Sequence, residues 1–292
     1  MNPMDSKRGP TSIGSQREKA EAFRALHHAN RMLVLPNAWD VASSRVFEDE
    51  GFAAIATSSA ALAVSVGYPD GEKIPKEELF VVVRRIARAL TVPLSVDLES
   101  GYGVNSEEVT DTIRRLVESG AVGLNIEDTI RLGGKSLRPL EEQVDRIRTV
   151  RKASDALEMP IVINARTDAY LIGGGDPRVR LEEAIRRGNA FEAAGADCLY
   201  PMGLADRDTI SAFVKHVDKP VNVMVRQGTP PISELERLGV RRLSLGPGPM
   251  YAAMGLLRRI ASELREKGTY DALRSGAITF DELMGLAIPK QR

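Results

Sequence analysis

Short runs of apolar residues recur eight times between residues 32 and 246, each bounded by polar or turn-forming positions. A run of five to eight residues is the length of a strand and too short for a typical helix. Their almost continuous apolar character is typical of parallel strands that are buried on both faces. The predicted strands are residues 32–37, 53–58, 94–99, 123–128, 161–168, 198–202, 221–225 and 242–246.

The stretches between these runs have the period of amphipathic helices. In residues 76–90, for example, one apolar stripe has the arginines on its other side and consists of Leu79, Val82, Val83, Ile86 and Leu90. Strands that alternate with helices predict parallel β/α units, and eight such units close a (β/α)8 (TIM) barrel. An open, doubly wound parallel sheet is the alternative.

The chain has no Pro/Ser-rich linker, so the sequence predicts a single α/β barrel domain over residues 17–269. Within it, residues 17–31 predict a helix that covers the bottom of the barrel. Residues 1–16 are predicted to be a flexible tail, and residues 270–292 a C-terminal helical extension.

The composition limits the partners. The 292 residues include 40 Lys+Arg and 40 Asp+Glu, so no net charge attracts nucleic acid or an anionic membrane. The polar start has no apolar core of a signal peptide, and no apolar stretch is long enough to span a bilayer. A single cysteine is consistent with a reducing compartment. We therefore predict a soluble, cytoplasmic protein.

Carboxylates gather where the predicted strands end, which is where a barrel of this type carries its chemistry. Asp97 and Glu99 are two positions apart and should face the same way on a strand, and Glu127 ends the neighbouring strand. Three converging carboxylates need a cation, and oxygen ligands favour Mg²⁺, with Mn²⁺ possible, over Zn²⁺. The alternative is that these acids cap helices and pair with arginines.

Two further features could hold a carboxylate substrate. Arg166 lies inside an apolar strand and needs an anionic partner, either Asp168 or Glu127 or a substrate carboxylate held by two hydrogen bonds. After the second strand, Ser58 and the following N–H groups could cradle an anion, although ordinary turn chemistry explains them as well.

Other reactive groups are unfavourably placed. His27 and His28 fall on the N-terminal helix and His216 after the sixth strand, so histidine acid–base catalysis is not expected. Cys198 is expected to be a buried, inert thiol.

With these residues identified, the chain resembles the isocitrate lyase/phosphoenolpyruvate mutase superfamily from about residue 17 to residue 267. The resemblance rests on motifs in the family's order: PNAWD (36–40), TSSAALAVSVGYPDG (57–71), DLESGYG (97–103), NIEDT (125–129), INARTDAY (163–170), AGADCLYPMG (194–203) and SLGP (244–247). The DLESGYG stretch corresponds to the metal motif of the family.

The resemblance implies roles for individual residues. Asp97 would bind Mg²⁺, with Glu99 and Glu127 acting largely through water, and Asp70 would lie beside the metal. Arg166 would bind a substrate carboxylate, while Ser58 and the backbone of Ser59 and Ala60 would hold the other end of an oxo acid; Asn222 completes the predicted substrate contacts. Members are (β/α)8 barrels that usually exchange the last barrel helix within homodimers or homotetramers.

The chain also departs from the family. Isocitrate and methylisocitrate lyases carry a Cys- and His-containing lid after the fourth strand, whereas residues 129–138 contain neither residue type. Those lyases tend to have glutamate where this chain has Met202, and the phosphonate enzymes use a histidine near this point. Residues 129–138 still suit a mobile lid. Lys135, Ser136 or Tyr102 could supply a proton.

The sequence thus predicts a Mg²⁺-dependent lyase or decarboxylase that cleaves a C–C bond in a small 2-oxo or 2-hydroxy di- or tricarboxylate through an enolate. One alternative is an enzyme of P–C bonds, a phosphoenolpyruvate mutase or phosphonopyruvate hydrolase. Another is a non-catalytic barrel that binds an oxo acid.

Overall fold

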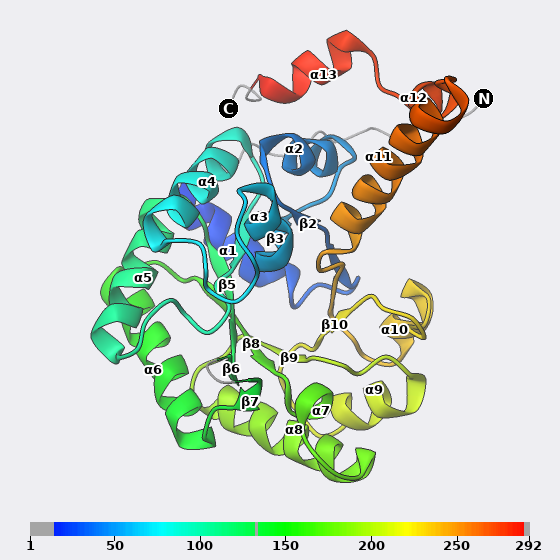
Figure 1. Ribbon diagram of the computed structural model, residues 1–292. Coiled ribbons are helices and arrows are strands. Elements are labelled where there is room, and N and C mark those ends of the chain that lie inside the picture. Colours follow the sequence, from blue (N-terminus) through cyan, green and yellow to red (C-terminus); the bar gives the residue numbers. More distant parts are fainter. Residues whose placement is uncertain (1–14, 132–133, 289–292) are drawn as a thin grey trace, which may run out of the picture.

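A ring of strands surrounded by helices forms most of the molecule (Figure 1). The computed structural model describes residues 15–131 and 134–288. Parallel ladders join the strands in the orders β1-β11-β10 and β2-β3-β4-β5-β8-β9, and β6-β7 is an antiparallel hairpin. The strands are β1 (Leu33–Leu35), β2 (Asn37–Ala38), β3 (Ile55–Thr57), β4 (Leu94–Asp97), β5 (Gly123–Glu127), β6 (Thr129–Ile130), β7 (Ser136–Leu137), β8 (Val162–Thr167), β9 (Cys198–Pro201), β10 (Asn222–Met224) and β11 (Arg242–Ser244).

Two links close these ladders into one barrel. The first is Pro36, which separates β1 from β2 along one continuous stretch of chain. Proline has no N–H for the ladder, so a single strand position is divided in two. The second is a parallel bridge between Leu199 and Val221 that connects β9 with the β10 segment. The result is a ring of eight strand positions, which confirms the predicted (β/α)8 barrel and excludes the open sheet.

Helices cover the outside of the ring through their apolar stripes. In α4, Leu79, Val83 and Ile86 are buried as the sequence pattern predicts. The helices of the described residues are α1 (Gln16–Leu26), α2 (Val41–Asp49), α3 (Ser59–Ser65), α4 (Lys76–Ala89), α5 (Ser106–Glu118), α6 (Leu140–Ala156), α7 (Ala169–Ile172), α8 (Pro177–Ala193), α9 (Arg207–Val214), α10 (Ile232–Arg237), α11 (Gly248–Lys267), α12 (Asp271–Arg274) and α13 (Phe280–Ala287). None of them is long and apolar enough to cross a membrane.

Helix α1 closes the bottom of the barrel, as predicted. Phe23 is fully buried there in a cluster with Leu35 and Val122. Its ring approaches β5 so closely that a Cβ at Gly123 would lie 2.6 Å from it. The predicted tail extends too far, because Gln16 already belongs to α1 and donates to the backbone carbonyls of Val117 in α5 and of Ala121 in the α5–β5 connection. Residues 1–14 lie outside the described part of the chain.

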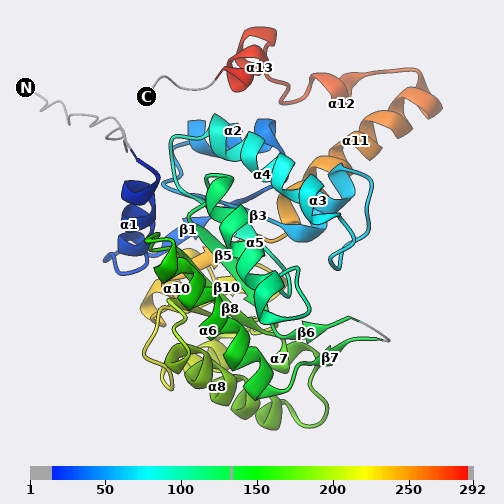
Figure 2. The same cartoon turned by 90° about the vertical axis from the view of Figure 1, so that its left-hand side faces the viewer.

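The C-terminal helices leave the barrel. Figures 1 and 2 show α11 projecting outward, with α12 and α13 beyond it. Met250 is the one buried residue of α11 in a helix of 20 residues, and α13 returns to pack against α2. The predicted helical extension therefore takes the form of two short helices, and residues 289–292 lie outside the described range.

Candidate active site

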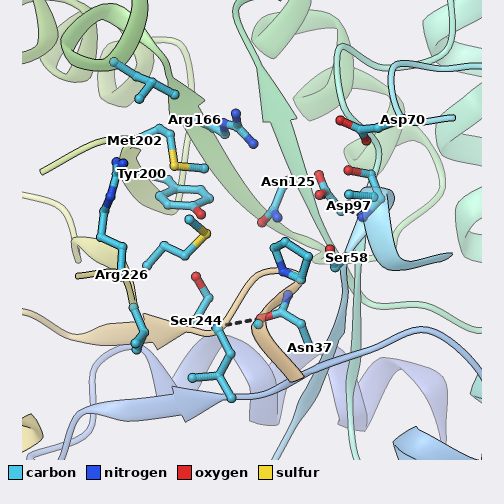
Figure 3. Close-up of a pocket in the computed structure, with 18 of the residues that line it drawn as sticks. Asn37, Ser58, Asp70, Asp97, Asn125, Arg166, Tyr200, Met202, Arg226 and Ser244 are labelled. Carbon is cyan, nitrogen blue, oxygen red and sulfur yellow. Dashed lines mark hydrogen bonds between the residues drawn. The ribbon is translucent and has the colours of Figure 1, made fainter. Parts of the chain in front are cut away.

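A cavity of about 540 Å³ opens at the carboxyl ends of the barrel strands (Figure 3). This volume is within the range of small-molecule sites, and this end of a (β/α)8 barrel is where catalytic groups lie. Seven of the residues that the sequence analysis singled out line it: Ser58, Ser59, Ala60, Asp70, Asp97, Lys135 and Arg166. The tertiary structure therefore brings most of the predicted site together.

The start of α3 forms one wall of the cavity. Ser58 is the N-cap of this helix, and its side chain accepts a hydrogen bond from the N–H of Ala61. The N–H of Ser59 donates to Oδ2 of Asp97 over 3.1 Å. This N–H therefore orients a carboxylate rather than facing a ligand directly. Ala60 follows in the first turn, where helical N–H groups have no acceptor within the helix.

Asp97 and Glu99 do not face the same way along one strand, contrary to the prediction. Strand β4 ends at Asp97, and Glu99 already has a positive φ of 50°. Because the chain has left the extended conformation, alternation along a strand no longer places these two side chains on one face. Glu99 turns instead towards the next loop, where its Oε1 accepts from the N–H of Glu72 at 2.8 Å. Its Oε2 is buried without a hydrogen-bond partner.

A guanidinium that the sequence analysis did not single out lies among the acids. Arg131, which follows β6, is 3.0 Å from Oε1 of Glu127, 3.3 Å from Oδ2 of Asp70 and 3.7 Å from Oε2 of Glu99. Its side chain passes over Gly71, where a Cβ would come within 2.9 Å of the Arg131 Cδ. The four-residue spacing from Glu127 indicates a contact only in a helix, and residues 127–131 run from the end of β5 through β6, so no local sequence signal pointed to Arg131.

Arg131 also separates two cavities. It lines the main cavity and a second one of about 440 Å³, and Glu99 and Glu127 line only the second. Asp97 lines only the main cavity. Within residues 15–131 and 134–288, no group of three or more His, Cys, Asp and Glu is close enough to hold a metal ion. The structure thus places Asp97 on the main cavity and Glu99 and Glu127 on the second one, and the metal-binding roles of the three acids stay predictions.

The acids nevertheless keep an excess of negative charge. Burial, followed by the like charges of Asp70, Asp97 and Glu127, raises the pKa of Glu99 to about 8. Burial also raises the pKa of Glu127, against the opposing effect of Arg166. Both shifts have the physical cause expected of carboxylates in a site that needs more positive charge.

Arg166 contacts both of the acids, Asp168 and Glu127, that the sequence analysis gave as alternatives to a substrate carboxylate. Its Nε and Nη2 donate to the two oxygens of Asp168 at 2.6 and 2.8 Å, and its Nη1 lies 2.9 Å from Oε2 of Glu127. These three contacts use three of the five N–H donors of a guanidinium. Because Arg166 also lines the cavity, its remaining donors are available to a ligand there.

Asp168 and Asp128 hold this arrangement in place. Burial alone would raise the pKa of Asp168, but Arg166 outweighs it and holds that pKa below its ordinary value. Asp128 accepts from the N–H of Asp168 and from Thr167, and it forms an ion pair with Arg187. Asp128 therefore pairs with an arginine and holds neighbouring backbone in place, which is the structural alternative that the sequence analysis gave for the acids.

The floor and inner wall of the cavity contain residues that the sequence analysis missed. Asn125 lies between Asp97 and Tyr200 in the view of Figure 3. Burial raises the pKa of Tyr200 to about 12, so its phenol is a protonated donor at neutral pH. Ser244 lies beside them from β11. These residues lie within largely apolar strands. The sequence could have indicated them only if the side of each strand that faces the barrel interior had been identified.

Asn222 and Tyr102, which the sequence analysis also predicted, line neither of these two cavities. Asn222 is fully buried and donates to Oγ of Ser244, one level deeper in the barrel. Tyr102 follows the turn at Glu99 and packs against the hydrophobic core, and burial raises its pKa further above its ordinary value. The predicted roles of Asn222 as a substrate contact and of Tyr102 as a proton donor stay predictions.

The β6–β7 hairpin forms the outer edge of the site. Lys135 lines the main cavity, whereas Ser136 is exposed and pairs with Ile130 in the hairpin ladder. Of the three predicted proton donors, Lys135 is thus the one that the cavity contains. Residues 132 and 133 of the predicted lid lie outside the described part of the chain.

Histidines and the thiol are absent from the cavity lining, as expected from their positions. His27, His28 and His216 do not line it, and Cys198 is fully buried with its pKa raised to about 12 by burial.

Comparison with known proteins identifies the family. A family model described as phosphoenolpyruvate phosphomutase matches residues 23–265. The chain belongs to the phosphoenolpyruvate phosphomutase family. This assignment confirms the resemblance to the isocitrate lyase/PEP mutase superfamily and the expectation that the protein is an enzyme.

Relatives of this phosphoenolpyruvate phosphomutase family member align along almost its whole length. An oxaloacetate decarboxylase of Rhodopseudomonas palustris (strain HaA2) is 32% identical over 94% of this chain and 91% of its own. A 2-methylisocitrate lyase of Bacillus subtilis (strain 168) is 29% identical over 87% of this chain and 84% of its own. The crystal structure of a candidate lyase/mutase from Burkholderia cenocepacia J2315 is 37% identical, with a TM-score of 0.87 over 94% of this chain and 98% of that one.

Proposed function

We propose that this protein is a Mg²⁺-dependent lyase or decarboxylase that cleaves a C–C bond in a small 2-oxo or 2-hydroxy di- or tricarboxylic acid. The observation that carries the proposal is the single cavity in which Asp97 and Arg166 face the same space. Such a cavity offers a carboxylate for a hard cation and a guanidinium for a substrate carboxylate. The oxaloacetate decarboxylase and 2-methylisocitrate lyase relatives support this class of reaction.

The residues present fit a magnesium ion of the partly hydrated kind. Mg²⁺ commonly keeps several waters and binds through one or two carboxylates together with substrate oxygens, so a cluster of three acids is not required. Asp97 faces the main cavity, and the buried Oε2 of Glu99 has no hydrogen-bond partner. We assign Asp97 as the ligand, with Glu99 and Glu127 acting through water. Bound there, Mg²⁺ (or Mn²⁺) would supply a Lewis acid for the charge that develops on an enolate oxygen.

The chain's own groups would bind and orient the substrate. In an oxo acid, the bond that breaks lies one carbon away from the oxo carbon. Its electron pair stays on the carbon next to the oxo group as an enolate, and a proton must then reach that carbon. In a hydroxy acid, the hydroxyl group must also lose its proton as it becomes a carbonyl. The free donors of Arg166 can hold a carboxylate of the substrate, with Glu127 and Asp168 keeping the guanidinium in place. Ser58 and the N–H of Ala60 lie across the cavity and can hold the other end. Lys135 is our candidate for the proton donor.

A P–C bond enzyme remains the second candidate function, because the family model is that of a phosphomutase. The wall of the cavity argues against it, since strand β9 ends in Pro201 and is followed by Met202 where a histidine was expected for that chemistry. A barrel that only binds an oxo acid is the third candidate.

We propose further that the protein is a cytoplasmic homodimer or homotetramer in which α11 is exchanged between subunits. This helix projects from the barrel, and large apolar side chains on it are exposed, among them Tyr251, Met254 and Leu257. A second copy of the chain would cover this face, and Tyr251 lines the main cavity, so the assembly would also enclose the site.

The test is a substrate panel with purified protein and Mg²⁺: oxaloacetate, 2-methylisocitrate, 2,3-dimethylmalate, isocitrate and phosphonopyruvate, followed by release of pyruvate, glyoxylate or phosphate. Release of pyruvate or glyoxylate that Asp97→Ala abolishes is the expected result. Phosphate release from phosphonopyruvate would establish the second candidate, and binding of oxalate without any turnover would establish the third. Glu107→Ala, a change on the exposed face of α5, is the control for nonspecific loss.

A further inference from the structure

A buried arginine lies beneath the cavity floor without a carboxylate partner. Arg242 of β11 is fully buried, and no ion pair joins it to an acid within the described residues. Its Nε has no hydrogen-bond partner. A buried charge of this kind normally requires an anionic partner. The groups that accept hydrogen bonds from Arg242 in place of a carboxylate are therefore of interest.

One of these neighbours is a histidine of the N-terminal helix. Nδ1 of His27 lies 2.8 Å from the carbonyl oxygen of Phe23, and because a carbonyl can only accept, Nδ1 carries the hydrogen. Nε2 is therefore the acceptor, and it faces Nη1 of Arg242 at 3.4 Å. The arginine thus meets a neutral acceptor at the barrel bottom.

The other neighbour is Asn125, whose side chain spans the floor of the cavity. Oδ1 of Asn125 accepts from Nη2 of Arg242 at 3.2 Å and from Nδ2 of Asn164 at 2.8 Å. A guanidinium has only donors, so the amide of Asn125 must turn its oxygen down towards Arg242. Its NH2 group is then left on the cavity side, where Asn125 forms part of the lining (Figure 3).

We propose that Asn125 is a substrate-binding residue that donates to an anionic oxygen of the oxo acid at the deepest point of the cavity. Arg242 is the positioning residue that fixes the orientation of this amide. The inference deepens the proposed function and rests on it. Asn125 is the partner of Asp97 in the β4–β5 ladder, so the donor lies beside the carboxylate assigned to the metal.

This arrangement also determines which chemical groups the floor accepts. The NH2 group of Asn125 has two N–H donors, and the guanidinium of Arg242 behind it has no carboxylate partner. Both features favour a ligand oxygen that only accepts hydrogen bonds, such as that of a carboxylate or an enolate. A hydroxyl or amine that must donate would find no acceptor on Asn125, because Oδ1 already accepts two bonds. The floor therefore selects for the end of the substrate that carries the planar oxo acid.

The test uses oxalate, a small planar dianion, and measures its Kd by calorimetry in the presence of Mg²⁺. Asn125→Asp has the same shape and gives Arg242 a carboxylate partner, so the variant should fold, but it replaces the donor with an anion. We expect oxalate binding to weaken at least about tenfold. Ser95→Ala, which removes another polar group from the barrel interior outside the cavity lining, should leave the Kd unchanged.

Arg242 is tested as a positioning residue by comparing Arg242→Gln with Arg242→Lys. Glutamine can also accept, so it no longer imposes one orientation on the Asn125 amide, whereas lysine only donates. We expect weaker oxalate binding in the glutamine variant and recovery in the lysine variant. In the wild-type protein, the side-chain NH2 resonances of Asn125 should shift on addition of oxalate, a readout that a purely structural asparagine would not give.

The outcomes separate this inference from the proposed function. If the wild-type protein and Asn125→Asp bind oxalate equally well, or the NH2 resonances do not move, Asn125 is not a ligand donor, whereas the lyase proposal stands. If wild-type protein binds no oxalate and turns over no member of the substrate panel, both fail together.

Discussion

Nη2 of Arg131 lies 3.0 Å from Oε1 of Glu127, and the same guanidinium reaches towards Asp70 and Glu99. The guanidinium of Arg131 thus lies among three acids, two of which, Glu99 and Glu127, the sequence assigns to a divalent ion. The chain supplies part of the positive charge that these carboxylates need, from a hairpin at the edge of the site. This relationship leads to a prediction about metal affinity.

Replacing Arg131 by glutamine should strengthen binding of the divalent ion. The substitution removes a positive charge that repels the ion and neutralises nearby acids, which corresponds to at least about 1 kcal/mol, or roughly fivefold in Kd. Mn²⁺ binding followed by electron paramagnetic resonance measures the effect. Lys73→Gln removes the same charge from an exposed residue on the second cavity and should change the Kd much less. Weaker binding by Arg131→Gln would mean that Arg131 helps to hold the ion's ligands.

The substitution Arg166→Ala should reduce kcat/KM by about tenfold to a hundredfold or more, because a hydrogen-bonded contact to a charged group contributes roughly 1.5–3 kcal/mol. Steady-state kinetics on the substrate found in the panel measures this loss. The same change leaves Glu127 and Asp168 buried without their cation, so the free energy of unfolding should also fall, by about 3–5 kcal/mol.

Arg166→Lys separates these two effects. Lysine keeps the positive charge between Glu127 and Asp168 but cannot hold a carboxylate with a planar pair of donors. We expect most of the stability to return in urea denaturation while kcat/KM stays low. Full recovery of kcat/KM in the lysine variant would show that Arg166 acts only on its two acidic neighbours.

The stability of the barrel should fall as the pH is lowered from 7 to 5, partly through His27. Burial and then the charge of Arg242 lower the pKa of His27 to about 3, although Asp197 opposes the shift. Between pH 6.5 and this value, the unfolded chain binds a proton that the folded chain does not, so protonation favours unfolding. The loss is about 2 kcal/mol at pH 5. In His27→Gln, the free energy of unfolding should change less between pH 7 and pH 5, and an unchanged slope would contradict a neutral His27.

Replacing Leu257 by glutamate should shift the protein from an oligomer to a monomer. The side chain of Leu257 is 55% exposed on the projecting helix α11, and a charge there would be buried at the proposed interface. Light scattering coupled to size-exclusion chromatography gives the mass. Arg84→Glu, on the exposed side of α4, is the control. A wild-type monomer would contradict the exchange of α11.

Much of the fold could be predicted because it depends on local patterns. The eight apolar runs became the eight strand positions, and the stripe of α4 became its buried face. The candidate site could be predicted in part for the same reason. Asp97 is the last residue of one barrel strand, and Arg166 lies near the end of another. Because the strands are parallel, the order of the elements was enough to predict that both residues lie at the carboxyl end of the barrel.

The partners of these residues could not be predicted in the same way. Glu99 left the expected face because the chain turns at a positive φ two residues after the strand, which no alternation rule describes. Arg131, Asn125 and Arg242 were missed because their importance lies in contacts between residues that are 4 to 215 positions apart.

The amino-acid sequence by itself therefore determined the (β/α)8 architecture, the end of the barrel that carries the chemistry and the main charged groups there. Periodic burial and the order of the elements are sufficient for these properties, since they depend on each segment and its neighbours along the chain. The tertiary structure alone decided which carboxylate faces the cavity, which cation neutralises the others and which way the amide of Asn125 points. These properties depend on distances of a few ångströms between separate strands, where electrostatic and hydrogen-bonding energies change steeply.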